Sequence, residues 1–148
     1  MNADITQDEA DKLFAMEKHY LGTEQISLPL YGGRKEIPLH SEDKREEFLL
    51  DVSRGSSIAL HRMTYQNRVR TTIILVRVDF GSSTHRNPDG EVLPCPHIHL
   101  YRVGYGDKWA YPLPDSFDKN ALMQDFIQTF MDYCHVVTKP VIEMEMFT

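Results

Sequence analysis

Two histidines separated by one residue, His97 and His99, are the clearest candidates for chemistry in this chain. In a β-strand, side chains two residues apart point to the same face, so both imidazoles would meet the same ligand or substrate. Cys95 and Tyr101 continue this alternation on either side of the pair. Imidazole has an ordinary pKa of about 6.5, so two of them can serve as base and acid near neutral pH. The spacing therefore indicates acid–base catalysis or a metal site.

A metal site would need a third ligand beside the two histidines. Zinc and non-haem iron accept imidazole nitrogen and thiolate sulfur, Cys95 shares the predicted face, and His85 lies in the preceding loop. No downstream Glu or His stands at a clear ligand spacing. The run is also similar to the histidine-triad motif of nucleotide hydrolases, but Tyr101 stands where that motif needs its third histidine. We expect no cofactor; if zinc is bound, the predicted ligands are His97, His99, Cys95 and His85.

A metal-free site could cleave RNA through its own 2′-hydroxyl, which requires a base, an acid and a cation for the phosphate. His97 and His99 would supply base and acid, and Tyr101 is the third catalytic candidate. Basic side chains would hold the phosphate and aromatic side chains would stack a base. The predicted binding residues are Arg68, Arg70, Lys108, Trp109 and Tyr111.

Arg77 and Asp79 form a second polar pair, on one face of an otherwise apolar run. A buried pair of this kind could orient a substrate. Ion pairs near the end of a sheet are more commonly structural, because a buried charge needs a partner. We therefore interpret Arg77 and Asp79 as a structural ion pair. Cys134, late in an amphipathic helix, is interpreted as a core residue.

The elements that must position the histidines are strands. The runs 95–103 and 107–113 alternate and enclose the turn Gly104–Asp107, which predicts a hairpin with Trp109 and Tyr111 on one face of its second strand. The run 67–80 contains six apolar or β-branched residues at 71–76 and is predicted to be a central strand, preceded by another strand at 57–65. Residues 81–94 form a long loop with a Pro-Asp-Gly turn.

The remaining segments supply helices and edge strands. A capping box at Thr6–Glu9 and a stop at Gly22 predict a helix over 6–21. Short strands at 26–30 and 36–40 flank a turn at 31–34, which predicts a small hairpin. Ser41 is a candidate N-cap for a second helix over 42–53. Apolar residues at spacings of three and four predict a helix over 118–134, and 140–147 is a possible final strand.

The fold class expected from this order is α+β: a mainly antiparallel sheet packed against a C-terminal helix, with N-terminal helices and a small N-terminal hairpin. Residues 1–148 are expected to form a single domain. Hydrophobic residues make up 41% and charged residues 26%, which is ordinary for a globular protein. No apolar run approaches the roughly 20 residues that span a bilayer, and no signal peptide is evident. We expect a cytoplasmic protein with no membrane partner.

The net charge of −6 argues against a generally basic nucleic-acid binder, but the charge is uneven. Residues 55–113 hold seven Lys and Arg against four Asp and Glu, a net of +3, while the rest of the chain carries −9. A mildly basic segment thus carries the histidines between acidic flanks. This distribution leaves RNA as a possible partner of the middle segment and a protein as a possible partner of the acidic flanks.

Four strings, DKREEFLLDVSRG, RNPDG, PHIHLYRVGYGDKWAYPLP and YCHVVTKP, resemble an uncharacterised family of bacterial and prophage proteins, a domain of unknown function. The resemblance covers about residues 9–147. It implies a bacterial or phage cytoplasmic source and implies no activity.

Two functional hypotheses follow. In the first, the protein binds or processes RNA through the His97/His99 face, as a metal-independent ribonuclease-like toxin or phage factor. In the second, it is a non-catalytic interaction or inhibitor protein of a mobile element that binds a host or defence protein. Solvent exposure of the two histidines distinguishes the hypotheses, because catalysis on RNA needs both in an open cleft.

Overall fold

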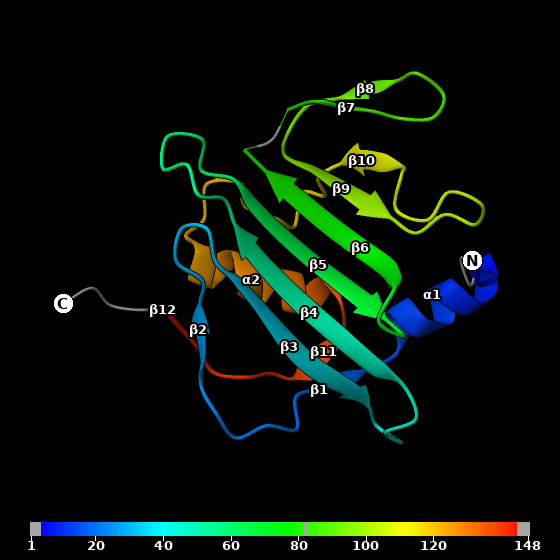
Figure 1. Ribbon diagram of the computed structural model, residues 1–148. Helices are drawn as coiled ribbons and strands as arrows, with labels where there is room; N and C mark the ends of the chain where they lie inside the picture. The colour runs from blue at the N-terminus through cyan, green and yellow to red at the C-terminus, as the bar shows by residue number, and fades with distance from the viewer. Residues whose placement is uncertain (1–3, 82, 145–148) are drawn as a thin grey trace.

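An eight-stranded sheet forms the centre of the computed structural model, which describes residues 4–81 and 83–144 (Figure 1). Neighbouring strands are antiparallel, except that the last two run parallel. In sheet order the strands are β10 (Ala110–Pro112), β9 (His97–Leu100), β6 (Ile73–Phe80), β5 (Met63–Val69), β4 (Glu47–Arg54), β3 (Arg34–Ser41), β1 (Lys18–His19) and β11 (Val136–Thr138). The prediction of an α+β fold with a mainly antiparallel sheet is confirmed.

Two small sheets and two helices make up the rest of the regular secondary structure in the described residues. β2 (Ile26–Leu28) pairs parallel with β12 (Ile142–Met144), and β7 (His85–Arg86) pairs antiparallel with β8 (Val92–Leu93). The helices are α1 (Gln7–Ala15) and α2 (Met123–Tyr133). No helix among these residues is long and apolar enough to cross a membrane.

One face of the sheet is apolar and is covered by α2 (Figure 1). Along β4, Phe48, Leu50 and Val52 alternate toward this face and are fully buried. Tyr65 of β5 extends the same surface and packs against Phe126 of α2, with ring centroids 4.8 Å apart. The apolar stripe of α2 therefore forms one core with alternate residues of the central strands, as the helical spacing predicts.

The opposite face of the sheet carries polar side chains in one row across five strands. Pairing places Glu36 opposite Asp51, Asp51 opposite Gln66, Gln66 opposite Arg77, and Arg77 opposite His99. Directly opposite residues in an antiparallel ladder point to the same face. Acids, arginine and imidazole from distant parts of the sequence are thereby brought side by side.

The predicted helix over 42–53 is wrong, because this segment is strand β4. Phe48, Leu50 and Val52 also recur with period two, and pairing with both β3 and β5 buries that face. Tertiary pairing thus overrides the helical interpretation of the same apolar residues. Ser41 does not cap a helix; its Oγ accepts a hydrogen bond from the Glu46 backbone N–H at 3.0 Å in the turn before β4.

The N-terminal hairpin predicted between 26–30 and 36–40 does not form. The turn between the segments is present, since the Gly33 N–H donates to the Leu30 carbonyl at 2.8 Å. β2 nevertheless pairs with β12, and β3 pairs with β4 and β1 in the large sheet. A turn signal locates the change of direction but does not determine which strand becomes the partner.

Several element boundaries differ from the predicted ones. Helix α1 begins at its predicted cap, where Thr6 Oγ1 accepts from the Glu9 N–H at 3.1 Å, but it ends at Ala15 instead of Leu21. The turn between β5 and β6 lies at Arg70–Thr71, both with positive φ, and not near Gln66. Helix α2 begins at Met123 rather than 118. The predicted strand over 140–147 is described as β12 over 142–144, and its residues 145–147 lie outside the described residues.

A fully buried lysine explains why α1 ends early. Lys18 of β1 points inward, and its Nζ donates to the carbonyls of Phe14, Met16 and Cys134 at 2.8, 3.0 and 2.7 Å. These carbonyls lie at the C-terminal ends of α1 and α2, where backbone acceptors lack intrahelical donors. One ammonium group therefore ties both helix ends to the sheet. Burial lowers the pKa of Lys18 from 10.5 to about 8, although the nearby Cys134 acts in the opposite direction.

We predict that the stability of the protein relative to a Lys18→Met variant rises as the pH increases from 8 to 10.5. In this range folded Lys18 loses its proton while the unfolded chain keeps it, so the unfolded state binds more protons and stability increases with pH. Urea unfolding of both proteins across this range measures the difference. Lys12→Met, on the exposed side of α1, is the control and should show a flat difference; a flat or falling difference for Lys18→Met contradicts the account.

Candidate metal centre

The pairing of β6 with β9 creates a cluster of two histidines and an aspartate. Arg77 lies opposite His99 and Asp79 lies opposite His97 in this ladder. The intervening residues Val78 and Ile98 point to the apolar core, so the four polar side chains share the outer face. The predicted same-face arrangement of His97 and His99 is confirmed, with ring centroids 4.9 Å apart.

Both imidazole rings are oriented by backbone carbonyls. Nδ1 of His97 lies 3.0 Å from the Pro94 carbonyl oxygen, and Nδ1 of His99 lies 2.8 Å from the Asp107 carbonyl oxygen. A carbonyl oxygen can only accept, so each Nδ1 must carry the hydrogen. In the neutral rings, Nε2 is then the unprotonated nitrogen. This is the arrangement by which proteins fix a histidine tautomer for metal binding.

The two Nε2 atoms converge on the carboxylate of Asp79. Its Oδ2 lies 3.5 Å from Nε2 of His97 and 3.2 Å from Nε2 of His99. Its Oδ1 accepts from Thr64 Oγ1 at 3.2 Å, and Arg77 Nε donates to Oδ2 at 3.3 Å while lying 3.2 Å from Oδ1. One ligand atom from each of Asp79, His97 and His99 lies within 4.8 Å of the others. We call these three residues the Asp–His–His centre.

Arg77 balances part of the negative charge around the centre. Besides Asp79, its guanidinium pairs with Asp107 and places Nη2 3.1 Å from Nε2 of His99. With neutral histidines, one arginine and two aspartates leave a net charge of −1. Arg77 can donate to Nε2 of His99, whereas Nε2 of His97 faces the Asp79 oxygen. Two acceptors facing each other indicate a place for a cation.

The electrostatic environment favours ionised Asp79 and neutral His97. Burial lowers the pKa of His97, and the nearby His99 and His85 act in the same direction, outweighing Asp79 and the Pro94 carbonyl. Burial acts to raise the pKa of Asp79, but its interactions with His99, Arg77 and His97 bring it below its usual value. An anionic carboxylate and a neutral imidazole are the forms that bind metal.

The loop between β6 and β9 covers the centre. The ring of His85 in β7 lies edge-on to His99 at 4.7 Å, and its Nε2 lies 2.7 Å from the Lys108 carbonyl. Asn87 binds both backbone groups of Ala110, donating at 2.9 Å and accepting at 2.8 Å, which holds the loop on β10. The predicted Pro-Asp-Gly turn is confirmed by the hydrogen bond from Gly90 N–H to the Asn87 carbonyl.

The histidines themselves are closed to solvent. The side chains of His97 and His99 are 2% and 1% exposed, whereas that of Asp79 is 15% exposed and that of Arg77 is 26% exposed. The centre therefore reaches the surface along Asp79 and Arg77 and not through the imidazoles. A small molecule could approach from that side, but a folded RNA strand could not contact both rings.

Two predicted members of the histidine face lie elsewhere. Cys95 turns its Sγ toward the backbone carbonyl of Asp79 at 3.2 Å, outside the set of converging ligand atoms. Tyr101 follows the end of β9 and is buried in the core instead. Its hydroxyl accepts from the N–H of Ile5 and donates to the carbonyl of the same residue. The expected alternation ends at Leu100 because the strand ends there, so Tyr101 has a structural contact.

The predicted RNA-binding residues are not gathered at one place. Arg68 pairs with Asp51 at 2.7 Å and Glu36 at 2.6 Å, and Arg70 pairs with Glu46 and Glu9. Both arginines already have acidic partners. The other three candidates lie in different surroundings. Tyr111 packs against the apolar core, Trp109 stacks against the guanidinium of Arg102, and Lys108 is exposed.

Asp79 is the member of the centre that sequence reasoning did not place there. The sequence predicts only its ion pair with Arg77, which the 3.2 Å contact confirms. The missing information is the pairing of β6 with β9 across the loop 81–94. The signal was available in principle, because two consecutive strands of one sheet commonly pair.

A family model described as "Family of unknown function (DUF6978)" matches residues 5–136. No curated protein and no solved structure matches the chain. The match covers most of the chain and includes all three residues of the Asp–His–His centre.

We predict that Arg77→Met lowers the free energy of unfolding of metal-free protein by about 2–3 kcal/mol, because Asp79 and Asp107 lose their shared cation in a partly closed site. Arg34→Met is the matched control. Arg34 lies on the same face beside Glu36 and Asp51 but is half exposed, and Asp51 keeps Arg68 as a closer partner, so the loss of Arg34 should change stability by less than about 0.5 kcal/mol. Urea unfolding measures both values, and equal losses for the two variants would refute the role assigned to Arg77.

Proposed function

The chain belongs to the family of unknown function DUF6978, and we propose that it is a metalloprotein that binds one divalent transition-metal ion at Asp79, His97 and His99. Two imidazoles and one carboxylate are ligands that zinc and non-haem iron accept. The ligands come from two adjacent strands of a rigid sheet. This placement suits a site that must hold its geometry.

The observation that carries the proposal is the meeting of His97 Nε2 with Asp79 Oδ2. The backbone carbonyl of Pro94 takes the ring hydrogen at Nδ1, so neutral His97 turns a lone pair toward a carboxylate. A bound cation would convert this repulsion into coordination. Thr64 holds the other carboxylate oxygen and Arg77 contacts both, as the outer partners of metal ligands commonly do.

Three protein ligands leave coordination positions for water or substrate, which is typical of catalytic metal sites and not of structural ones. A bound ion would activate water or polarise a substrate oxygen. Arg77, at the solvent side of the centre, would attract a small anionic substrate toward it. We therefore propose metal-assisted chemistry on a small anion.

The geometry supports this proposal better than metal-free RNA cleavage or a purely non-catalytic role. The two histidines are closed to solvent, so they cannot serve as base and acid on a nucleic-acid strand. Arg68 and Arg70 are neutralised by acids, so they present little free charge to phosphate. The convergence of two oriented imidazoles on one carboxylate is the feature that favours a metal site over a purely non-catalytic role. The bacterial or phage source and the cytoplasmic location stay predictions.

We predict that protein stripped of metal binds one equivalent of Zn²⁺ or Co²⁺ and that its melting temperature rises on binding, because the ion binds only the folded state. Asp79→Asn and His97→Ala should each weaken binding by more than about 100-fold. Isothermal titration calorimetry measures the affinity and circular dichroism verifies the fold. Cys95→Ser and His85→Ala are the matched controls, since both residues lie beside the centre without contributing a converging ligand atom.

Two results would contradict the proposal. One is no binding of either ion by folded protein, or equal binding by Asp79→Asn. The other is RNA cleavage that persists in chelator and disappears with His97→Ala, which would favour the metal-free nuclease instead.

A further inference from the structure

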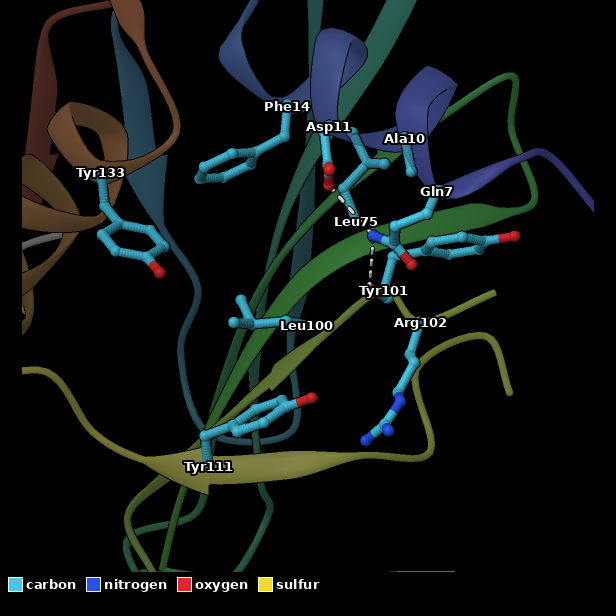
Figure 2. Close-up of a pocket in the computed structure, with 10 residues that line it drawn as sticks. All are labelled: Gln7, Ala10, Asp11, Phe14, Leu75, Leu100, Tyr101, Arg102, Tyr111 and Tyr133. Atoms are coloured by element: carbon cyan, nitrogen blue, oxygen red, sulfur yellow. Dashed lines mark hydrogen bonds between the residues drawn. The ribbon is translucent and has the colours of Figure 1, made fainter. Parts of the chain in front are cut away.

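A cavity of about 460 Å³ lies on the other side of the sheet from the Asp–His–His centre, between α1, α2 and the end of β9 (Figure 2). Ala10 and Phe14 line it from α1, Leu75 and Leu100 from the sheet, and Tyr133 from α2. Leu100 pairs with Val76 on the face opposite His99, so the sheet separates this cavity from the Asp–His–His centre. The volume lies within the range of small-molecule sites.

The interior of the cavity is apolar with aromatic walls. Figure 2 shows Leu100 between the rings of Tyr111 and Tyr133, with Phe14 above. Neither tyrosine hydroxyl has a hydrogen-bond partner among residues 4–81 and 83–144. An apolar space with two phenol groups at its sides suits a flat hydrophobic ligand that carries a polar end.

Arg102 stands at the mouth of the cavity without an acidic partner in the described part of the chain. Its guanidinium lies 4.1 Å above the ring of Trp109, which covers one face of the group. Stacking on the face leaves the N–H donors at the edge free, and these donors match a carboxylate. Arg34, Arg68, Arg70 and Arg77 each have carboxylate partners, so Arg102 differs from them.

The opposite side of the cavity mouth carries the acidic Asp11, which is hydrogen-bonded to Gln7. Gln7 donates to Asp11 at 3.0 Å and to the Tyr101 carbonyl (Figure 2), and it accepts from the Val103 N–H. Gln7 is thus fully occupied. The charge of Asp11 opposes a ligand with two negative charges. A single carboxylate is therefore favoured over a phosphate.

From these contacts we infer that the cavity binds a small aromatic monocarboxylate, with its ring between Tyr111, Tyr133 and Leu100 and its carboxylate on Arg102. The inference does not depend on a metal at the Asp–His–His centre. Nothing in it requires a change of backbone conformation, because the aromatic walls and the stacked guanidinium are already in place.

The test uses the only tryptophan of the chain as reporter, because Trp109 contacts Arg102. Titration of the full protein with 3-phenylpropionate should change Trp109 fluorescence and saturate. The neutral amide of the same molecule should bind at least about tenfold more weakly, since a charge-assisted hydrogen bond is lost. Phenyl phosphate should also bind more weakly than the carboxylate, because of Asp11.

Arg102→Gln should lose the preference for carboxylate over amide, and Arg45→Gln, whose side chain is 86% exposed, is the control that should keep it. Both positions are at the surface, so the variants should fold, which circular dichroism verifies. Equal affinity for carboxylate and amide in the unchanged protein overturns the inference. So does an undiminished preference in Arg102→Gln, or no binding of 3-phenylpropionate at millimolar concentration by fluorescence and calorimetry.

Discussion

The register between β6 and β9 is the constraint on which the proposed site depends. Val78 opposite Ile98 and Val76 opposite Leu100 bury apolar side chains on one face of the sheet. A slip of one residue would expose these side chains and turn the polar ones into the core. The hydrophobic effect on one face thus determines which charged groups meet on the other. No direct attraction between histidine and aspartate is needed to bring them together.

Polar groups that are brought together in this way must still be satisfied. The centre is held by backbone carbonyls at both Nδ1 atoms, by Thr64 and by Arg77. The loop 83–94 and β10 close the site, with Asn87 binding Ala110 as a strand would. Partly desolvated charges interact more strongly than exposed ones, so a bound cation would be held firmly and an unbalanced charge would be costly.

Local sequence patterns correctly predicted the features that are determined by residues close to one another in the sequence. The alternation around His97 and His99, the turn at 87–90 and the apolar stripe of α2 are all present. The helix predicted over 42–53 is wrong because the apolar residues of this segment fit a helix and a strand equally well. Only the pairing with β3 and β5 decides between the two. The position of Asp79 beside the histidines, and the pairing of β2 with β12, depend on contacts distant in sequence. Periodicity contains no information about such partners.

X-ray absorption spectroscopy of the zinc-loaded protein tests the central claim most directly, because it reports which atoms surround the ion. The account predicts a shell of nitrogen and oxygen at about 2.0–2.2 Å with imidazole scattering from two histidines and no sulfur. Asp79→Asn should alter this shell, whereas Cys95→Ser should leave it unchanged. A sulfur contribution at about 2.3 Å, or a shell of water oxygens without imidazole, would contradict the assignment of Asp79, His97 and His99 as the ligands.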